Sequence, residues 1–234
     1  MLRLSIKKNK GETMSRKISV TLLFLVVSLF ALNAFTLDGI VMSTTGIGAT
    51  YLNDPISDSG AQPGDDIIAT GPVGVHGTVI LAHREGLKFD TDLVSDVAPL
   101  WMPIRDCLDV GGVHAMKDPT RGGTAVALNE IASKSGVEIS IKENQVPIRQ
   151  AVGSLCDILG LDPLHMSSEG VAIMAVDSTK TDGVLKALKK HKATEDAQVI
   201  GHVQDGKPRV IMTTSIGGTK VVQVPYGEPV PRVC

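Results

Sequence analysis

Hydrophobic and polar positions follow two alternating patterns after residue 62. In some stretches apolar residues recur every three or four positions, as on one helix face; in others they form short runs or alternate with polar residues, as in strands. The first pattern predicts helices over residues 78–86, 95–109, 124–135, 151–159 and 184–190. The second predicts strands over residues 66–71, 113–116, 137–141, 171–176, 199–203 and 210–213.

Glycine and proline mark the limits of several of these elements. Gly136 and Gly160 each follow a predicted helix, at the position where a left-handed residue ends it. Pro99 is tolerable near the start of the helix predicted over residues 95–109, whereas Pro103 is expected to bend it. Residues 53–65 are rich in Asn, Asp, Pro, Ser and Gly and are expected to form a loop. Helices and strands that alternate in this way predict an α/β, or α+β layered, fold.

The first 37 residues do not share this pattern. Residues 18–37 are uncharged, and residues 1–17 before them carry six basic side chains and one acidic one. This is the layout of a signal peptide or of a single membrane anchor, although bulky Leu32 suits cleavage after Ala34 poorly. The alternative is a segment foreign to the domain, from a truncated or misread frame with an internal start at Met14. Both interpretations stay open.

Composition narrows the class of protein. The chain has 24 Gly without a three-residue period and only 3 Cys, which excludes a collagen-like chain and a disulfide scaffold. After the leader, acidic side chains outnumber basic ones and no basic stripe remains, so nucleic-acid binding is not supported. The odd number of widely spaced cysteines suits a reducing compartment.

The clearest local candidate for chemistry is the loop Asp118-Pro-Thr-Arg-Gly-Gly123, between a predicted strand and a predicted helix. Glycines let backbone N–H groups approach an anion, and a helix N-terminus adds partial positive charge. Arg121 can add a bidentate contact to phosphate. The sequence alone supports equally a tight strand-to-helix turn with a solvated arginine.

Other candidates are weaker when taken singly. His76, between Gly74 and Gly77, can line a pocket, but a lone histidine at a helix start is more often a capping or packing residue. Glu169 precedes a predicted strand and is either a general base or a turn residue. Cys107 and Cys156 lie on apolar helix stripes and are expected to be core thiols.

Cys234 differs from the other two cysteines because it ends a proline-stiffened segment, Pro229-Val-Pro-Arg-Val-Cys234. A terminal thiol of this kind is either irrelevant or a carried nucleophile. Its own α-carboxylate disfavours the thiolate, whereas nearby Arg232 favours it. Composition leaves the choice open.

Four motifs together resemble the HypE family of hydrogenase maturation proteins, which are carbamoyl dehydratases. They are Asp118-Pro-Thr-Arg-Gly-Gly123, Leu159-Gly-Leu-Asp-Pro-Leu164, Ser168-Glu-Gly170 and the terminal Pro231-Arg-Val-Cys234. The last is the most specific, because that family ends in Pro-Arg-(Ile/Val)-Cys. The resemblance covers residues 38–234 and implies the fold of the aminoimidazole-ribonucleotide synthetase superfamily. There, an N-terminal and a C-terminal α/β domain pair into a homodimer and share an ATP site.

The resemblance also implies a reaction. In the family, the carbamoyltransferase HypF loads a carbamoyl group onto the terminal thiol, and ATP with Mg²⁺ drives its dehydration to a thiocyanate. The nitrile then passes to iron on the HypC–HypD scaffold. Carried over to this chain, Cys234 is the carrier nucleophile and Glu169 helps to remove the N–H proton. The cofactor-binding candidates are His76, Asp118, Arg121, Gly122 and Gly123.

Domain limits and departures follow from the same resemblance. Residues 38–62 match the last strand (40–44) and linker of the family's N-terminal domain, residues 63–222 its C-terminal domain, and residues 223–234 a flexible tail. The acidic Mg–ATP ligands belong to the unmatched part, so an incomplete ATP site and no metal ligands are expected here. Val75 replaces the Asp of the family's Gly-Asp-His-Gly, and Ser168 and Val171 replace the Asn and Lys of its Asn-Glu-Gly-Lys.

Two rival functions remain. One is a noncatalytic module that docks or dimerises within the maturation complex. The other is a different superfamily member such as selenophosphate synthetase, whose reactive residue would lie in the unmatched N-terminal region. ATP, carbamoyl transfer and a free thiol together predict a cytoplasmic location, the alternative being a membrane-anchored or exported protein if the leader is genuine.

Overall fold

The computed structural model describes residues 5–7, 13–15, 45, 51–52, 54–86 and 93–226. The leader segment 18–37, the predicted strand 40–44 and Cys234 lie outside the described residues. The chain divides into two compact units, Met1–Tyr51 and Leu52–Cys234. In the first unit, β1 (Ser5–Lys7) pairs antiparallel with β2 (Thr13–Ser15). Within the described ranges, no helix is long and apolar enough to cross a membrane.

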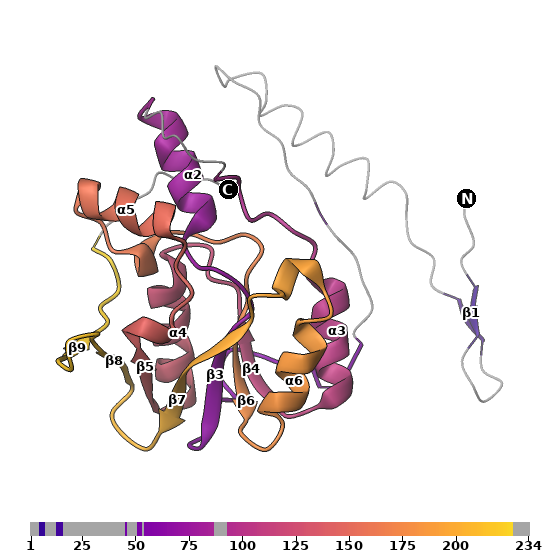
Figure 1. Cartoon of the computed structure of the whole chain (residues 1–234). Coiled ribbons are helices and arrows are strands. Elements are labelled where there is room, and N and C mark those ends of the chain that lie inside the picture. The colour runs from indigo at the N-terminus through magenta and orange to yellow at the C-terminus, as the bar shows by residue number, and fades with distance from the viewer. Residues whose placement is uncertain are drawn as a thin grey trace, which may run out of the picture. The chain divides into compact units, whose positions relative to one another are not determined.

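The second unit is built on a mixed seven-stranded sheet with the order β4-β6-β3-β7-β5-β8-β9 (Figure 1). Only β5 and β8 pair in parallel; the other neighbours are antiparallel. This sheet, with helices packed on it, confirms the α/β layered fold class. The strands are β3 (Asp65–Ala69), β4 (Val113–Lys117), β5 (Glu138–Lys142), β6 (Ile173–Asp177), β7 (Gln198–Gln204), β8 (Arg209–Thr213) and β9 (Thr219–Val221).

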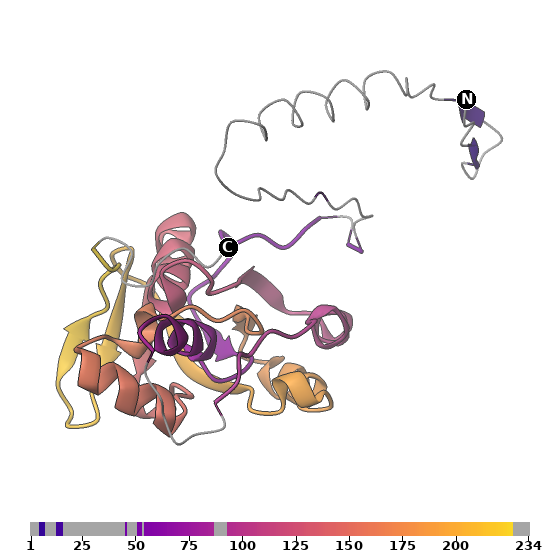
Figure 2. The ribbon, with the colours of Figure 1, turned by 90° about the horizontal axis from the view of Figure 1, so that it is seen from above.

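Helices cover both faces of this sheet. One face packs against α4, and the other packs against α3 and α6, which lie side by side (Figures 1 and 2). A smaller apolar cluster joins α2 to α5. The helices are α2 (Val75–Arg84), α3 (Trp101–Val110), α4 (Gly123–Ser135), α5 (Gln150–Leu159) and α6 (Thr181–Leu188), with 3-10 turns η1 (Glu143–Gln145), η2 (Pro163–His165) and η3 (Lys192–Thr194).

Strand β6 shows how the sequence fills both layers. Its side chains alternate between the two faces, as strand geometry requires. Ile173 and Ala175 join the cluster that contains α4, whereas Met174 and Val176 join the cluster that contains α3 and α6. All four are fully buried. The continuous apolar run in the sequence therefore marks a strand covered on both faces.

The helix predicted over residues 95–109 is wrong at its start. Residues 93–100 have no regular secondary structure, and α3 begins only at Trp101. Pro99 disfavours helical geometry at the residue before it, which accounts for the late start. Pro103 falls in the first turn of α3, where its missing N–H would have no helical acceptor, so the expected bend is not needed.

Both internal cysteines are core thiols, as predicted. Cys107 and Cys156 are free and fully buried. Burial raises the pKa of Cys107 to about 12 and that of Cys156 to about 11. Because the thiolate is the reactive form, neither is a nucleophile at neutral pH.

Candidate functional site

Three short segments that are far apart in the sequence meet where α2 and α4 begin, and Ser168 connects them. Its buried hydroxyl accepts a hydrogen bond from the N–H of Gly74 (2.8 Å). Its own N–H donates to the carbonyl of Pro119 (3.0 Å), and the N–H of Gly77 donates to the carbonyl of Ser167 (2.9 Å). The segments brought together are residues 74–77, 118–123 and 167–170.

The loop 118–123 enters α4 through two left-handed glycines. Gly122 has φ 69° and Gly123 has φ 64°. A Cβ on Gly123 would lie 2.5 Å from two backbone carbonyl oxygens of residues 164 and 166. The tight-turn interpretation therefore accounts for these glycines. Asp118 and Arg121 are exposed, and the Arg121 guanidinium is the group at this helix start that can bind an anion.

The motif at residues 159–164 leads into the turn against which loop 118–123 packs. Gly160, with φ 66°, ends α5 in the left-handed conformation. A side-chain oxygen of Asp162 then accepts a hydrogen bond from the N–H of Leu164 (2.9 Å) and so caps η2. The carbonyl groups against which Gly123 packs are thus held by a capped turn.

His76 lies in the first turn of α2 and is half-buried. Its Nδ1 lies 2.7 Å from the hydroxyl of Ser95, in the segment 93–100. The neighbouring Val75 is fully buried in the cluster between α2 and α5. The His76 side chain therefore lies in polar surroundings, whereas the adjacent Val75 side chain lies in apolar ones.

Glu169 is fixed through its backbone. Its N–H donates to Oδ1 of Asp96 (3.2 Å), and a Cβ on the next residue, Gly170, would overlap the carbonyl oxygen of Asp96. The half-buried Glu169 carboxylate makes no hydrogen bond or ion pair with another residue in the described part of the chain. Because the backbone is fixed and the carboxylate has no such partner, its oxygens are available to accept a proton.

Asp96 should make the free energy of unfolding of the protein measurably dependent on pH. Burial raises the pKa of its carboxyl group, against the lowering effect of the hydrogen bond from the Glu169 N–H. Because the folded-state pKa lies above the unfolded value of about 3.9, this carboxyl group costs stability as pH rises through that value. We expect the stability of Asp96→Asn relative to the wild type, measured by urea unfolding, to increase as pH rises from about 3 toward neutrality. Asp205→Asn, which replaces an exposed carboxylate, is the control. If the difference in free energy of unfolding between Asp96→Asn and the wild type does not change with pH across this range, the assignment is contradicted.

The C-terminal segment leaves the sheet beside the same loop. Val222 is buried, and its N–H donates to the carbonyl of Val210 (2.9 Å). Pro225 comes within 3.6 Å of the position that a Cβ on Gly122 would occupy. Even fully extended, the chain from Pro225 to Cys234 spans at most about 30 Å. The root of the tail, residues 222–225, therefore lies beside loop 118–123, whereas Cys234 lies outside the described residues.

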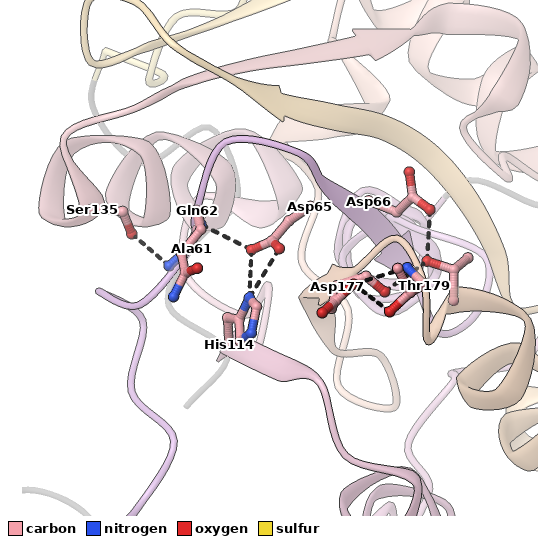
Figure 3. A network of polar contacts seen from close by, with 9 residues as sticks. Ala61, Gln62, Asp65, Asp66, His114, Ser135, Asp177 and Thr179 are labelled. Carbon is pink, nitrogen blue, oxygen red and sulfur yellow. Dashed lines mark hydrogen bonds and ion pairs between the residues drawn. The ribbon is translucent and has the colours of Figure 1, made fainter.

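A second polar network lies at the opposite end of β3 (Figure 3). Nδ1 of His114 lies 2.9 Å from an oxygen of Asp65, and Asp66 accepts a hydrogen bond from the hydroxyl of Thr181 (2.6 Å). No group of three or more His, Cys, Asp or Glu side chains that could hold a metal ion occurs among the residues described. These carboxylates are occupied by neighbouring side chains and close the end of the sheet.

The sequence does not single out Asp96 or the bridging role of Ser168. Asp96 falls in a stretch whose periodicity predicts helix, and only Pro99 signals otherwise. Ser168 is recognisable as a substitution within a motif, but its two partners lie far away along the chain.

Comparison with known proteins places the chain in a family. The family model described as "AIR synthase related protein, C-terminal domain" matches residues 62–213. A hydrogenase expression/formation protein of Methanocaldococcus jannaschii is 45% identical over 198 residues, 84% of this chain and 59% of the relative. Carbamoyl dehydratase HypE of Rhizobium leguminosarum bv. viciae is 42% identical over 200 residues, 84% of this chain and 57% of the relative.

Solved structures agree with these relatives. A crystal structure of HypE in complex with ATP has a TM-score of 0.72 and 36% identity, covering 74% of this chain and 54% of that chain. A HypE–HypF complex has a TM-score of 0.71 and 37% identity, covering 75% of this chain and 57% of that chain.

The chain belongs to the AIR synthase related proteins, of which it contains the C-terminal domain. Within that family, the relatives just described include hydrogenase maturation proteins named HypE, which confirms the resemblance seen in the motifs. The chain spans a little under three fifths of the length of these relatives, 59% and 57%.

Proposed function

We propose that this chain acts in the maturation of [NiFe] hydrogenases as a HypE-like carbamoyl carrier, with Cys234 as the carrying thiol. In the intact family the carbamoyl group is then dehydrated, with ATP, to a thiocyanate; this chain is expected to carry the group but to lack a complete ATP site. One observation carries the proposal: Pro225, near the start of the C-terminal tail, lies against loop 118–123. The same loop is hydrogen-bonded to Ser168, the neighbour of Glu169. The relatives' name, carbamoyl dehydratase, supports the same reaction.

The chemistry assigned to Cys234 is covalent. Its thiolate attacks a carbamoyl carbon on the transferase's donor; an S–C bond forms and the donor's leaving group departs. The carbamoyl oxygen then takes the γ-phosphoryl group of ATP, one N–H proton leaves, and ADP is released. Loss of phosphate and of the second N–H proton produces the C≡N bond on sulfur. Glu169 is the proposed acceptor for an N–H proton.

The residues at the start of α4 suit the phosphate end of ATP. Arg121 is exposed there, beside the N-terminus of a helix of 13 residues, and both features favour an anion. ATP, when bound with Mg²⁺, would supply the phosphoryl group that makes the carbamoyl oxygen a leaving group. Asp118, Gly122 and Gly123 would shape this edge of the site, and His76 would line it from α2.

The chemistry of this cycle also implies its partners. A HypE–HypF complex is among the similar solved structures, and we extend a HypF-like carbamoyltransferase to this chain as the carbamoyl donor. The iron scaffold HypC–HypD is the proposed acceptor of the nitrile, and the chain is expected to form a homodimer. Because the cycle requires ATP and a reduced thiol, it is assigned to the cytoplasm.

Intact mass measurement tests the carrier role. The full chain, incubated with carbamoyl phosphate, ATP and the transferase, is expected to gain one carbamoyl group, and Cys234→Ser is expected to gain none. Cys156→Ser is the matched control and should load like the wild type, because the Cys156 thiol is buried and its pKa is raised to about 11. Loading of Cys234→Ser would overturn the proposal. Formation of the thiocyanate by this chain alone would contradict only the expectation of an incomplete ATP site.

A further inference from the structure

Two side chains from different elements hold successive backbone carbonyl groups at the root of the C-terminal tail. Nδ2 of Asn129, on α4, donates to the carbonyl of Val222 (2.9 Å). Nε2 of His165, at the end of η2, donates to the carbonyl of Gln223 (3.1 Å). Neither residue belongs to the proposed reaction chemistry.

Both donors sit on supports that fix their direction. The same Asn129 Nδ2 also donates to the carbonyl of Ala125, one turn earlier in α4 (2.8 Å), which holds the amide in one orientation. His165 ends the turn that Asp162 caps and against which Gly123 packs. Groups held on rigid elements position a partner more accurately than groups on loops.

The two contacts act where the fold ends. Val222 is buried in the main core, whereas Gln223, Val224 and Tyr226 are exposed. Between Val224 and Tyr226, Pro225 lies 3.6 Å from the position that a Cβ on Gly122 would occupy. Asn129 and His165 therefore bind the backbone at the point where the chain leaves the core. From there the chain passes directly to the loop that contains Arg121.

We propose that Asn129 and His165 are positioning residues for the C-terminal tail, which hold its root beside loop 118–123 and so raise the effective concentration of Cys234 there. This inference rests on the proposed function for the purpose of the tail, but the positioning can be measured without any catalysis. If both contacts are lost while Val222 stays buried and bonded to Val210, the last fixed residue before Cys234 moves from Pro225 back to Val222, which lengthens the linking chain from 9 to 12 residues. The effective concentration should then fall about 1.5-fold, since it scales as about the −3/2 power of length.

A disulfide equilibrium measures this quantity. In an Arg121→Cys background, the engineered thiol and Cys234 are equilibrated with reduced and oxidised glutathione; two protein thiols are oxidised as glutathione disulfide is reduced to two thiols. The ratio of intramolecular disulfide to dithiol, set against the glutathione ratio, gives the effective concentration. Asn129→Leu combined with His165→Phe should lower it about 1.5-fold, and His165→Gln, which keeps a donor, should recover most of the loss caused by His165→Phe.

Matched controls use the same substitutions at sites away from the tail. Asn144→Leu on η1 and His83→Phe near the end of α2, both exposed positions, should leave the effective concentration unchanged. If Asn129→Leu fails to fold, His165→Phe alone decides the question. An effective concentration that is equal in the positioning variants and the controls would overturn the inference. Failure of carbamoyl loading on Cys234 with a normal drop in the disulfide measurement would instead overturn only the proposed function.

Discussion

Replacing Gly123 by alanine is expected to lower the free energy of unfolding by roughly 3–5 kcal/mol, a large part of the stability of an ordinary domain. The residue has φ 64°, where an L side chain is strained. Its Cβ would also lie 2.5 Å from the carbonyl oxygens of Leu164 and Met166 and 2.8 Å from the carbonyl carbon of His165. These are backbone atoms of a capped turn, so they cannot move aside cheaply.

Gly160→Ala is the matched control for that substitution. Gly160 has φ 66°, but a Cβ there would meet nothing within 4 Å. It should therefore lose only the backbone strain, about 1 kcal/mol. Urea unfolding followed by circular dichroism gives both values, and their difference isolates the packing of α4 onto η2. Equal losses in the two variants would show that this packing is not what requires glycine at position 123.

Elements that are defined by local signals were predictable from the sequence. The helix α4 ends at Gly136 and α5 ends at Gly160, both with positive φ, as the pattern of apolar residues and glycines indicates. The start of α3 was not, because residues 95–100 have helical periodicity but Asp96 is held by contacts to Glu169 and Gly170. Strand β9 is exposed throughout and has no periodic apolar signal.

The arrangement of the site depends on long-range pairing, which periodicity does not encode. Strands β5 and β8 pair in parallel although β6 and β7 lie between them in sequence. Ser168 reaches Gly74 and Pro119, each in a different segment. The motifs could be located individually, but their meeting depends on the order of strands in the sheet. The roles of Glu169 and Cys234 came from the family resemblance and remain predictions.

Replacing Val75 by aspartate, the residue of the family pattern at this position, should destabilise this chain by about 3 kcal/mol or more. Val75 is fully buried beside Val152, Cys156 and Met166. A carboxylate there would lose its hydration among apolar side chains. Its position at the start of α2 returns only about 0.3–1 kcal/mol through the helix dipole.

The pH dependence of Val75→Asp separates charge from shape. Burial should raise the folded-state pKa of the new carboxyl group above its unfolded value of about 3.9, so the deficit should be full at neutral pH and shrink as pH falls. Val75→Asn has nearly the same size without the charge, and its deficit relative to the wild type should change little with pH. Urea unfolding of both variants at several pH values gives the comparison. If Val75→Asp at neutral pH is as stable as Val75→Asn, the position is hydrated or paired with a cation, and the apolar packing between α2 and α5 does not select against charge there.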